Sequence, residues 1–264
     1  MKLGIIGDWS EEGFRYVNGK GLKMVEFCVN HNVNSAEFAA LVPSINEWQK
    51  KYDVKVGSMG RWGSERILPD GSINPAALQD DFTLVDAASQ LGCPVYNIGC
   101  NYIQDMNYNQ NCENAIAYFT KVLYYAKGKN VKIATYNCDW SNFVFNEDAW
   151  KNIHTVLPEL GIKYDISHCR GRRGDYLKEI RDWGERFYHF HVKGTIYVDG
   201  EGYDDAPAGL DQTDWPTVFA MLHTKGYEAM ASIEPHSSKW KGEMGEWGVD
   251  YTINYMRPFM WDKD

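Results

Sequence analysis

The sequence predicts a single (β/α)8 barrel that occupies all 264 residues. Eight short apolar runs alternate along the chain with longer amphipathic stretches, which is the pattern of consecutive βα units around a parallel sheet. One such barrel commonly takes about 250 residues. The first run is followed by GDWSEEG, which lacks the glycine-rich phosphate loop of a dinucleotide-binding fold. The closed barrel is therefore favoured over an open, doubly wound sheet.

The eight apolar runs have the length of β-strands, and each precedes a stretch with a helical pattern. In order, they are KLGII (2–6), LKMVEF (22–27), VKVGS (54–58), PVYNIG (94–99), VKIATY (131–136), IKYDI (162–166), FYHFHV (187–192) and EAMASIE (228–234).

Several of the expected helices carry start and stop signals. Asn34, Asn74 and Asp214 are capping residues, and a proline follows Asn74 directly and Asp214 two positions later. A glycine stands between a helix and the next strand at four places, where it suits a helix C-cap. These are Gly92, Gly128, Gly161 and Gly226.

Composition narrows the class of protein. The net charge of −9 argues against a nucleic-acid surface, which needs Lys and Arg to neutralise phosphates. No apolar run approaches the roughly 20 residues of a membrane helix, and the acidic start does not read as a signal peptide. The six cysteines form no CxxC pair. We therefore expect reduced thiols and a cytoplasmic location, while the sequence leaves open whether the chain forms a homo-oligomer.

Polar residues end three consecutive strands, at the edge where the active site of such a barrel lies. Asp165 ends the sixth strand, His191 the seventh and Glu234 the eighth. Separate salt bridges or helix caps would explain each residue alone. Three O, N and O donors at one level instead predict a site for one divalent metal ion, such as Mn, Co, Zn or Mg.

The segment HFHVKG (189–194) places His189, His191 and Lys193 on one face of the seventh strand. We expect His191 to be a metal ligand and His189 to be buried and hydrogen-bonded inside the barrel. Lys193, at the mouth, either contacts a substrate oxygen or pairs with an acidic neighbour.

The motifs YDISH (164–168), HFHVKG (189–194) and SIEPHS (232–237) resemble the last strand ends of the xylose-isomerase-like TIM barrel superfamily, the family of sugar phosphate isomerases and epimerases. The resemblance implies one divalent metal held by Glu, Asp, His and Glu from strands five to eight. Matched motif by motif, it implies Asp165, His191 and Glu234 as ligands.

The fifth strand departs from the family pattern, because Tyr136-Asn137 stands where the family commonly has Glu-Asn. Tyrosine is a poor ligand at neutral pH, since its pKa is about 10. The site then has either three protein ligands and water, or a fourth ligand from His168 or Asn137. The family's mechanism with two glutamate bases cannot be carried over intact, because only Glu234 of that pair is present.

Further residues are candidates for the mouth. Glu26, at the end of the second strand, either binds sugar hydroxyls, acts as a base or forms a salt bridge. His168 is either a general acid or base, or a loop histidine bonded to backbone. Four tryptophans after strands suit the apolar face of a sugar, with loop packing as the alternative for each. These are Trp9, Trp62, Trp140 and Trp240.

Two loops beside the mouth also stand out. Arg170, Arg172 and Arg173 in HCRGRRGD either bind a phosphate or belong to a solvated loop. The segment 194–213 is longer than most βα loops. We expect it to form a lid over the site, with Tyr197 or Tyr203 reaching the ligand.

The sequence predicts a metal-dependent isomerase or epimerase of a small sugar or keto-sugar. Glu234 is the expected base, which removes the proton next to a metal-bound carbonyl. The alternative is a lyase or dehydratase that eliminates a β-leaving group from a keto-sugar or keto-glycoside, with His168 or Tyr136 as substrate-contacting acid. A lower alternative is a non-catalytic sugar-binding barrel. A nuclease of the endonuclease-IV type is not expected, because it needs ligands for several metals.

Overall fold

The computed structural model describes residues 1–261 and shows eight parallel strands in a closed barrel. Around the barrel the strands follow the order β1-β10-β7-β6-β5-β4-β3-β2. They are β1 (Lys2–Ile6), β2 (Met24–Cys28), β3 (Lys55–Gly60), β4 (Val95–Ile98), β5 (Lys132–Tyr136), β6 (Gly161–Asp165), β7 (Phe187–Val192) and β10 (Met230–Ile233). The (β/α)8 barrel and its eight strands are confirmed.

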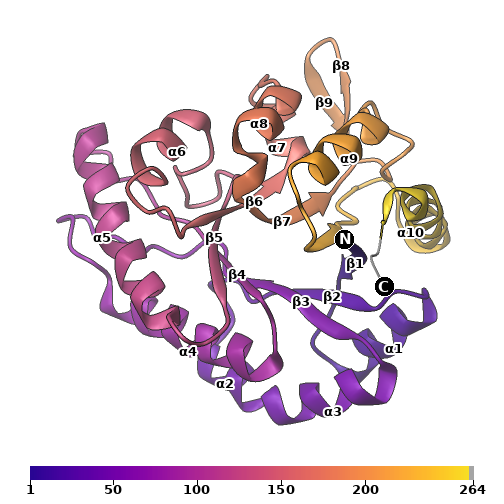
Figure 1. Ribbon diagram of the computed structural model, residues 1–264, viewed down its shortest axis with the longest axis horizontal. Helices are drawn as coiled ribbons and strands as arrows, with labels where there is room; N and C mark the ends of the chain where they lie inside the picture. The colour runs from indigo at the N-terminus through magenta and orange to yellow at the C-terminus, as the bar shows by residue number, and fades with distance from the viewer. Residues whose placement is uncertain (262–264) are drawn as a thin grey trace.

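Helices surround the barrel (Figure 1). They are α1 (Glu11–Gly19), α2 (Ser35–Ala40), α3 (Val42–Tyr52), α4 (Pro75–Leu91), α5 (Tyr108–Ala126), α6 (Glu147–Ile153), α7 (Ile166–Gly171), α8 (Tyr176–Trp183), α9 (Trp215–Thr224) and α10 (Gly242–Met256). The antiparallel hairpin of β8 (Ile196–Val198) and β9 (Glu201–Asp204) stands out beyond the barrel in Figure 1. It lies within the segment expected to be a lid.

Side-chain caps begin several helices as the sequence predicts. Asn34, Asn74 and Asp214 each accept a hydrogen bond from a backbone N–H of the first turn. Gly92, Gly128 and Gly226 follow helices with positive φ angles.

Gly161 is the exception among the four glycines, and its predicted role as a helix cap is wrong. It is the first residue of β6, and a Cβ there would lie 2.0 Å from the ring of Tyr188. The glycine is therefore required by the close approach of the Tyr188 ring.

Side chains fill the barrel and clamp one of its loops. Inside the barrel, Met24 and Met230 occupy the space that Gly4 and Gly57 leave open.

Outside the barrel, the buried Asp81 of α4 accepts hydrogen bonds from one arginine and two tyrosines at 2.6–3.1 Å. These partners are Arg66, Tyr96 and Tyr118. The network fixes the β3–α4 loop, which carries Trp62 to the mouth.

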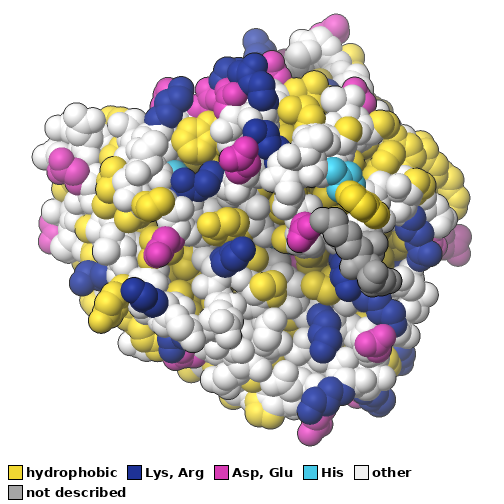
Figure 2. Space-filling model, viewed as in Figure 1, with side chains coloured by type: hydrophobic (Ala, Val, Ile, Leu, Met, Phe, Trp, Pro, Cys, Tyr) yellow, Lys and Arg dark blue, Asp and Glu magenta, His cyan; other side chains and the backbone are white. Residues whose placement is uncertain are grey.

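The surface carries charge of both signs. Figure 2 shows basic and acidic side chains interspersed over the face in view, with hydrophobic side chains gathered at the edge over α10. Across residues 1–261, no helix combines the length and the apolar character needed to cross a membrane.

Candidate metal and sugar site at the barrel mouth

Two histidines of β7 converge on Glu26, at the end of β2. His189 Nε2 lies 2.8 Å from Glu26 Oε2, and His191 Nε2 lies 2.9 and 3.0 Å from the two carboxylate oxygens. Burial alone raises the pKa of Glu26, but the two histidines outweigh it and hold that pKa well below its usual range. A carboxylate only accepts hydrogen bonds, so each Nε2 carries the hydrogen. The Nδ1 side of His191 faces the opposite way, toward the Glu234 carboxylate.

The geometry bears on the expectation that Glu26 contacts the substrate, acts as a base or forms a salt bridge. Both of its oxygens are engaged by histidines, and its side chain has no exposed surface. Among the alternatives for Glu26, its contacts resemble a salt bridge, with histidines as the partners in place of Arg or Lys. In this arrangement the Glu26 carboxylate holds the Nε2 sides of both histidine rings.

Asp165, His191 and Glu234 come together on the Nδ1 side of that ring. Each offers one ligand atom, and the three atoms lie within 4.8 Å of one another. Glu234 Oε2 is 2.8 Å and Asp165 Oδ2 is 3.9 Å from His191 Nδ1. Asp165 Oδ1 accepts the backbone N–H of Ser167 at 2.8 Å, whereas the buried Oδ2 has no hydrogen-bond partner within the described chain.

This donor set fits a divalent metal ion. A buried carboxylate oxygen without a partner costs free energy unless a ligand satisfies it, and here it faces a nitrogen and a second carboxylate oxygen. The hydrogen bond from the other ring nitrogen of His191 to a carboxylate is also typical of histidines that bind metals. The three predicted ligands are therefore held where they could bind one ion.

The end of β6 is positioned by the residue that follows β5. Asn137 Oδ1 accepts the backbone N–H of Asp165, and Asn137 Nδ2 donates to the Asp165 carbonyl, both at 2.9 Å. Asp165 pairs in register with His191 across β6 and β7, which sets the two side chains at one level. Since both ends of the Asn137 amide are engaged, this residue positions Asp165 instead of supplying the fourth ligand.

Three cationic or titratable groups surround the free oxygen of Asp165. His168 Nε2 is 3.5 Å, Lys193 Nζ 3.6 Å and Lys163 Nζ 3.9 Å from Asp165 Oδ2. Burial raises the pKa of Asp165, but Lys193, His168 and Lys163 outweigh it and lower that pKa to about 2. Burial lowers the pKa of His168 to about 4, so its ring is neutral near pH 7.

Lys163 lies beside Asp165 and is not among the candidates that the sequence indicates. Its side chain is only 2% exposed, and it points to the same side of β6 as Asp165. The signal was present, because a lysine inside a buried parallel strand is as unusual as the lysine of HFHVKG.

A cavity of about 420 Å³ opens over this cluster. Its walls include His168, Lys193 and Tyr197, the last from the β8–β9 hairpin, so the segment expected to form a lid lines the site. The hairpin is tied down at its base, since Arg170 donates to the Thr195 carbonyl at 2.8 Å and Lys239 donates to the Tyr203 carbonyl at 2.8 Å.

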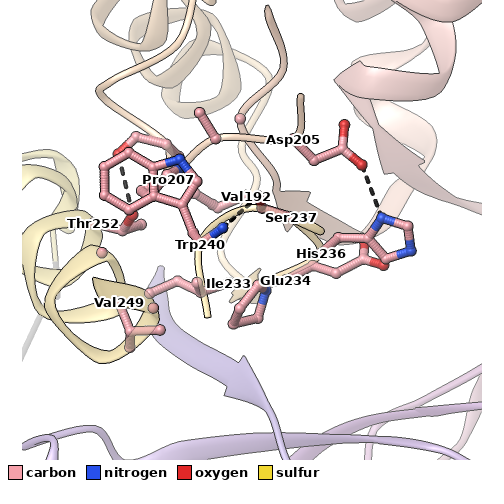
Figure 3. A pocket seen from close by; sticks show the side chains of 16 residues that line it. Val192, Asp205, Pro207, Ile233, Glu234, His236, Ser237, Trp240, Val249 and Thr252 are labelled. Carbon is pink, nitrogen blue, oxygen red and sulfur yellow. Dashed lines mark hydrogen bonds and ion pairs between the residues drawn. The ribbon is translucent and has the colours of Figure 1, made fainter. Parts of the chain in front are cut away.

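A second, narrower pocket lies beside Glu234 (Figure 3). Trp240 and Val249 face Pro207 in it, and Asp205 and His236 form an ion pair at 2.8 Å. This pair lines both pockets and so lies between them.

The predicted aromatic residues do not gather in one pocket. Trp9 packs edge-on against Phe27 and Phe38, and Trp240 stacks on Trp247. Trp140, which is 46% exposed, lies edge-on against His31 across the mouth.

Tyr136 and Trp62 form a buried stack at 5.3 Å. The Tyr136 hydroxyl lies beside Gly99 and donates to the Trp140 carbonyl at 3.2 Å. In this structure the hydroxyl is thus engaged by the protein's own backbone and not by Asp165.

The arginines of the α7 loop are largely committed within the protein. Arg172 donates to both carboxylate oxygens of Glu179, and Arg170 also donates to Gln212. The structure therefore favours an internal role for these two side chains over phosphate binding.

A parallel barrel with carboxylates and a histidine at the carboxyl ends of its last strands defines a class of TIM barrels. The sequence model of the xylose isomerase-like TIM barrel family matches residues 14–257. The chain belongs to this family. A comparison with curated protein sequences finds no match.

Solved structures with the same fold include sugar epimerases. A 3-keto-D-glucoside 4-epimerase from E. coli is 11% identical with a TM-score of 0.75, covering 98% of this chain and 99% of that chain. D-Psicose 3-epimerase from Clostridium cellulolyticum H10, solved with D-tagatose, is 14% identical with a TM-score of 0.74 and coverages of 98% and 99%. The IolI protein, solved with zinc, is 14% identical with a TM-score of 0.74 and 98% coverage of each chain.

Proposed function

We propose that the protein is a divalent-metal-dependent enzyme that isomerises or epimerises a sugar or keto-sugar. The observation that carries this proposal is the convergence of Asp165, His191 and Glu234 around a buried carboxylate oxygen that has no hydrogen bond among the described residues. Family membership and the sugar epimerases among the structural neighbours support it.

Asp165, His191 and Glu234 would hold the ion, whose identity we leave among Mn, Co, Zn and Mg. When bound, a divalent ion supplies Lewis acidity that polarises a substrate carbonyl. The IolI neighbour was solved with a zinc atom, which supports metal binding by a barrel of this fold.

Glu234 is the proposed base. Burial raises its pKa, but the hydrogen bond and charge of His191, together with the charges of Lys193 and Lys163, outweigh burial and hold the pKa well below its usual range, so the side chain is a carboxylate at neutral pH. It would take the proton from the carbon next to the carbonyl. Delivery of a proton from water to the opposite face of the same carbon gives an epimer, and transfer of the abstracted proton from Glu234 to the neighbouring carbon gives an isomer.

His168 and Lys193 would bind substrate oxygens. Both line the cavity, and the neutral ring of His168 can donate to or accept from a hydroxyl. The pKa of Lys193 is raised, because Asp165 and Glu234 outweigh the effect of burial, so its ammonium stays charged.

A second candidate function is β-elimination from a keto-sugar or keto-glycoside. It is favoured by Tyr136, which stands where the family resemblance implies a second carboxylate and whose buried hydroxyl donates to the Trp140 carbonyl. A site with one carboxylate base suits proton removal followed by loss of a leaving group as well as it suits isomerisation.

The test incubates the protein in D2O with ketoses or 3-keto-glycosides and added Mn, Co or Zn. NMR then measures the exchange of substrate C–H protons for deuterium, after paramagnetic ions have been removed. The proposal predicts deuterium next to the carbonyl, abolished in Glu234→Gln and kept in a control, Glu243→Gln, on α10. Release of an alcohol with exchange would favour elimination. No exchange with any substrate class would leave the non-catalytic sugar-binding barrel as the better account.

A further inference from the structure

Lys163 is a lysine of the barrel interior that has not been given a role so far. It lies on β6, two residues before Asp165, with a side chain that is 2% exposed. Among the residues that the structure describes, no side chain or carbonyl forms a hydrogen bond with its Nζ; its ion pair with Asp165 spans 3.9 Å. An ammonium in the barrel interior without a hydrogen bond to the described chain is costly, so the position favours a ligand that accepts from it.

The surroundings of Lys163 show where that ligand would lie. Nζ is 6.0 Å from the ring centroid of Trp62, which covers it from the β3 side. On the β5 side, its register partner Tyr136 turns its hydroxyl toward Gly99 and the Trp140 carbonyl. The remaining side faces Asp165 Oδ2, so a substrate oxygen that reaches the Asp165 carboxylate also comes within reach of this ammonium.

The charge of this side of the mouth is opposite to what the family resemblance implies. Tyr136 replaces a carboxylate on β5, and Lys163 beside it brings a positive charge. A carboxylate there would serve as a second base. An ammonium there suits a substrate oxygen that becomes negative during the reaction.

We propose that Lys163 is a catalytic residue that binds the oxyanion formed when a sugar substrate loses its proton. The inference rests on the proposed function and deepens it. Glu234 takes the proton, the C–H electron pair forms the new C=C bond, and the carbonyl π electrons move onto the oxygen. The product is an enediolate, whose negative oxygen accepts a hydrogen bond from Lys163, with no bond to the lysine formed or broken.

The experiment measures binding of an enediolate mimic, separately from turnover. D-Threonate has a planar carboxylate next to a hydroxyl, and threitol is a neutral polyol of the same chain length. Their dissociation constants are measured by ligand-observed NMR for the full chain, with and without added zinc. One charge-assisted hydrogen bond in a buried site corresponds to about a 10- to 100-fold change in affinity.

We expect Lys163→Met to weaken threonate binding about 10- to 100-fold and threitol binding less than twofold. Lys163→Gln keeps the side-chain length and polarity without the charge, and serves if the methionine variant fails to fold. Lys121→Met is the control: it removes a charge of the same kind from an exposed position on α5, away from the barrel mouth, and should leave threonate affinity unchanged.

Several results would overturn the proposal. Equal weakening of threonate and threitol would mean that Lys163 only shapes the mouth or neutralises Asp165. Unchanged threonate affinity in both Lys163 variants, or no threonate binding by the wild type, would also refute it. If threonate binding depends on Lys163 while no sugar exchanges a proton, the oxyanion site stands and the proposed reaction fails.

Discussion

Replacing Glu26 with glutamine tests whether this carboxylate orients the metal-binding histidine. Both Glu26 oxygens lie within 3.0 Å of His191 Nε2, and one lies 2.8 Å from His189 Nε2. In Glu26→Gln the amide keeps one acceptor and gains donors. A donor facing Nε2 favours the tautomer with the hydrogen on Nδ1, which removes the Nδ1 lone pair that a metal ion held with Asp165 and Glu234 would need.

The expected loss follows from what such carboxylates contribute in other sites. Removal of a carboxylate that orients a metal-bound histidine typically costs 10- to 100-fold in affinity, or about 1.4–2.7 kcal/mol. The full burial of Glu26 and both histidines places this site toward the upper end, since water cannot replace the lost contact.

The assay is competition for zinc between the protein and a chromophoric chelator, with folding checked by circular dichroism. Glu179→Gln is the matched control: this buried glutamate accepts from Tyr164 and Arg172 on the outer side of β6 and does not contact His191. A zinc affinity within twofold of the wild type in Glu26→Gln, or an equal loss in the control, would refute the orienting role.

Three further predictions concern stability, measured by urea denaturation. Burial lowers the pKa of His154 to about 3. Below the ordinary histidine pKa of about 6.5, the unfolded chain therefore takes up a proton that the folded protein excludes. The free energy of unfolding should fall by about 1.4 kcal/mol per pH unit from pH 6 to 4. His154→Gln should flatten that slope; an unchanged slope would contradict it. Gly161→Ala should destabilise the protein by about 1–3 kcal/mol, because the added Cβ meets the ring of Tyr188. In the control Gly19→Ala the added Cβ meets nothing within 4 Å, so this variant should be neutral or stabilising. Equal effects of the two substitutions would argue against the clash. Asp81→Asn should cost about 3–5 kcal/mol, because it leaves a buried arginine without its charge partner, and a loss below 1 kcal/mol would show that the network is dispensable.

The fold followed from the sequence because its signals are local. Each strand is a short apolar run, and caps such as Asn74 act within one helical turn. Gly161 was misread because its requirement comes from Tyr188, on a neighbouring strand, and no local pattern reveals a contact between strands.

The site was partly predictable for the same reason. Strand ends meet at one edge of a barrel, which located Asp165, His191 and Glu234. The partners of Glu26 could not be read, because they lie more than 160 positions away in the chain. The four tryptophans followed the expected strands, but the direction of each ring depends on neighbours such as Phe38 and Trp247.

The metal content of the purified protein tests the central claim most directly. Elemental analysis should find about one divalent ion per chain in the wild type, consistent with one three-ligand site. The ion should be lost in His191→Ala and Glu234→Ala and kept in His236→Ala, a histidine paired with Asp205 at the rim. A wild-type protein that binds no ion after Mn, Co or Zn is added, or an ion retained in both ligand variants, would contradict the account.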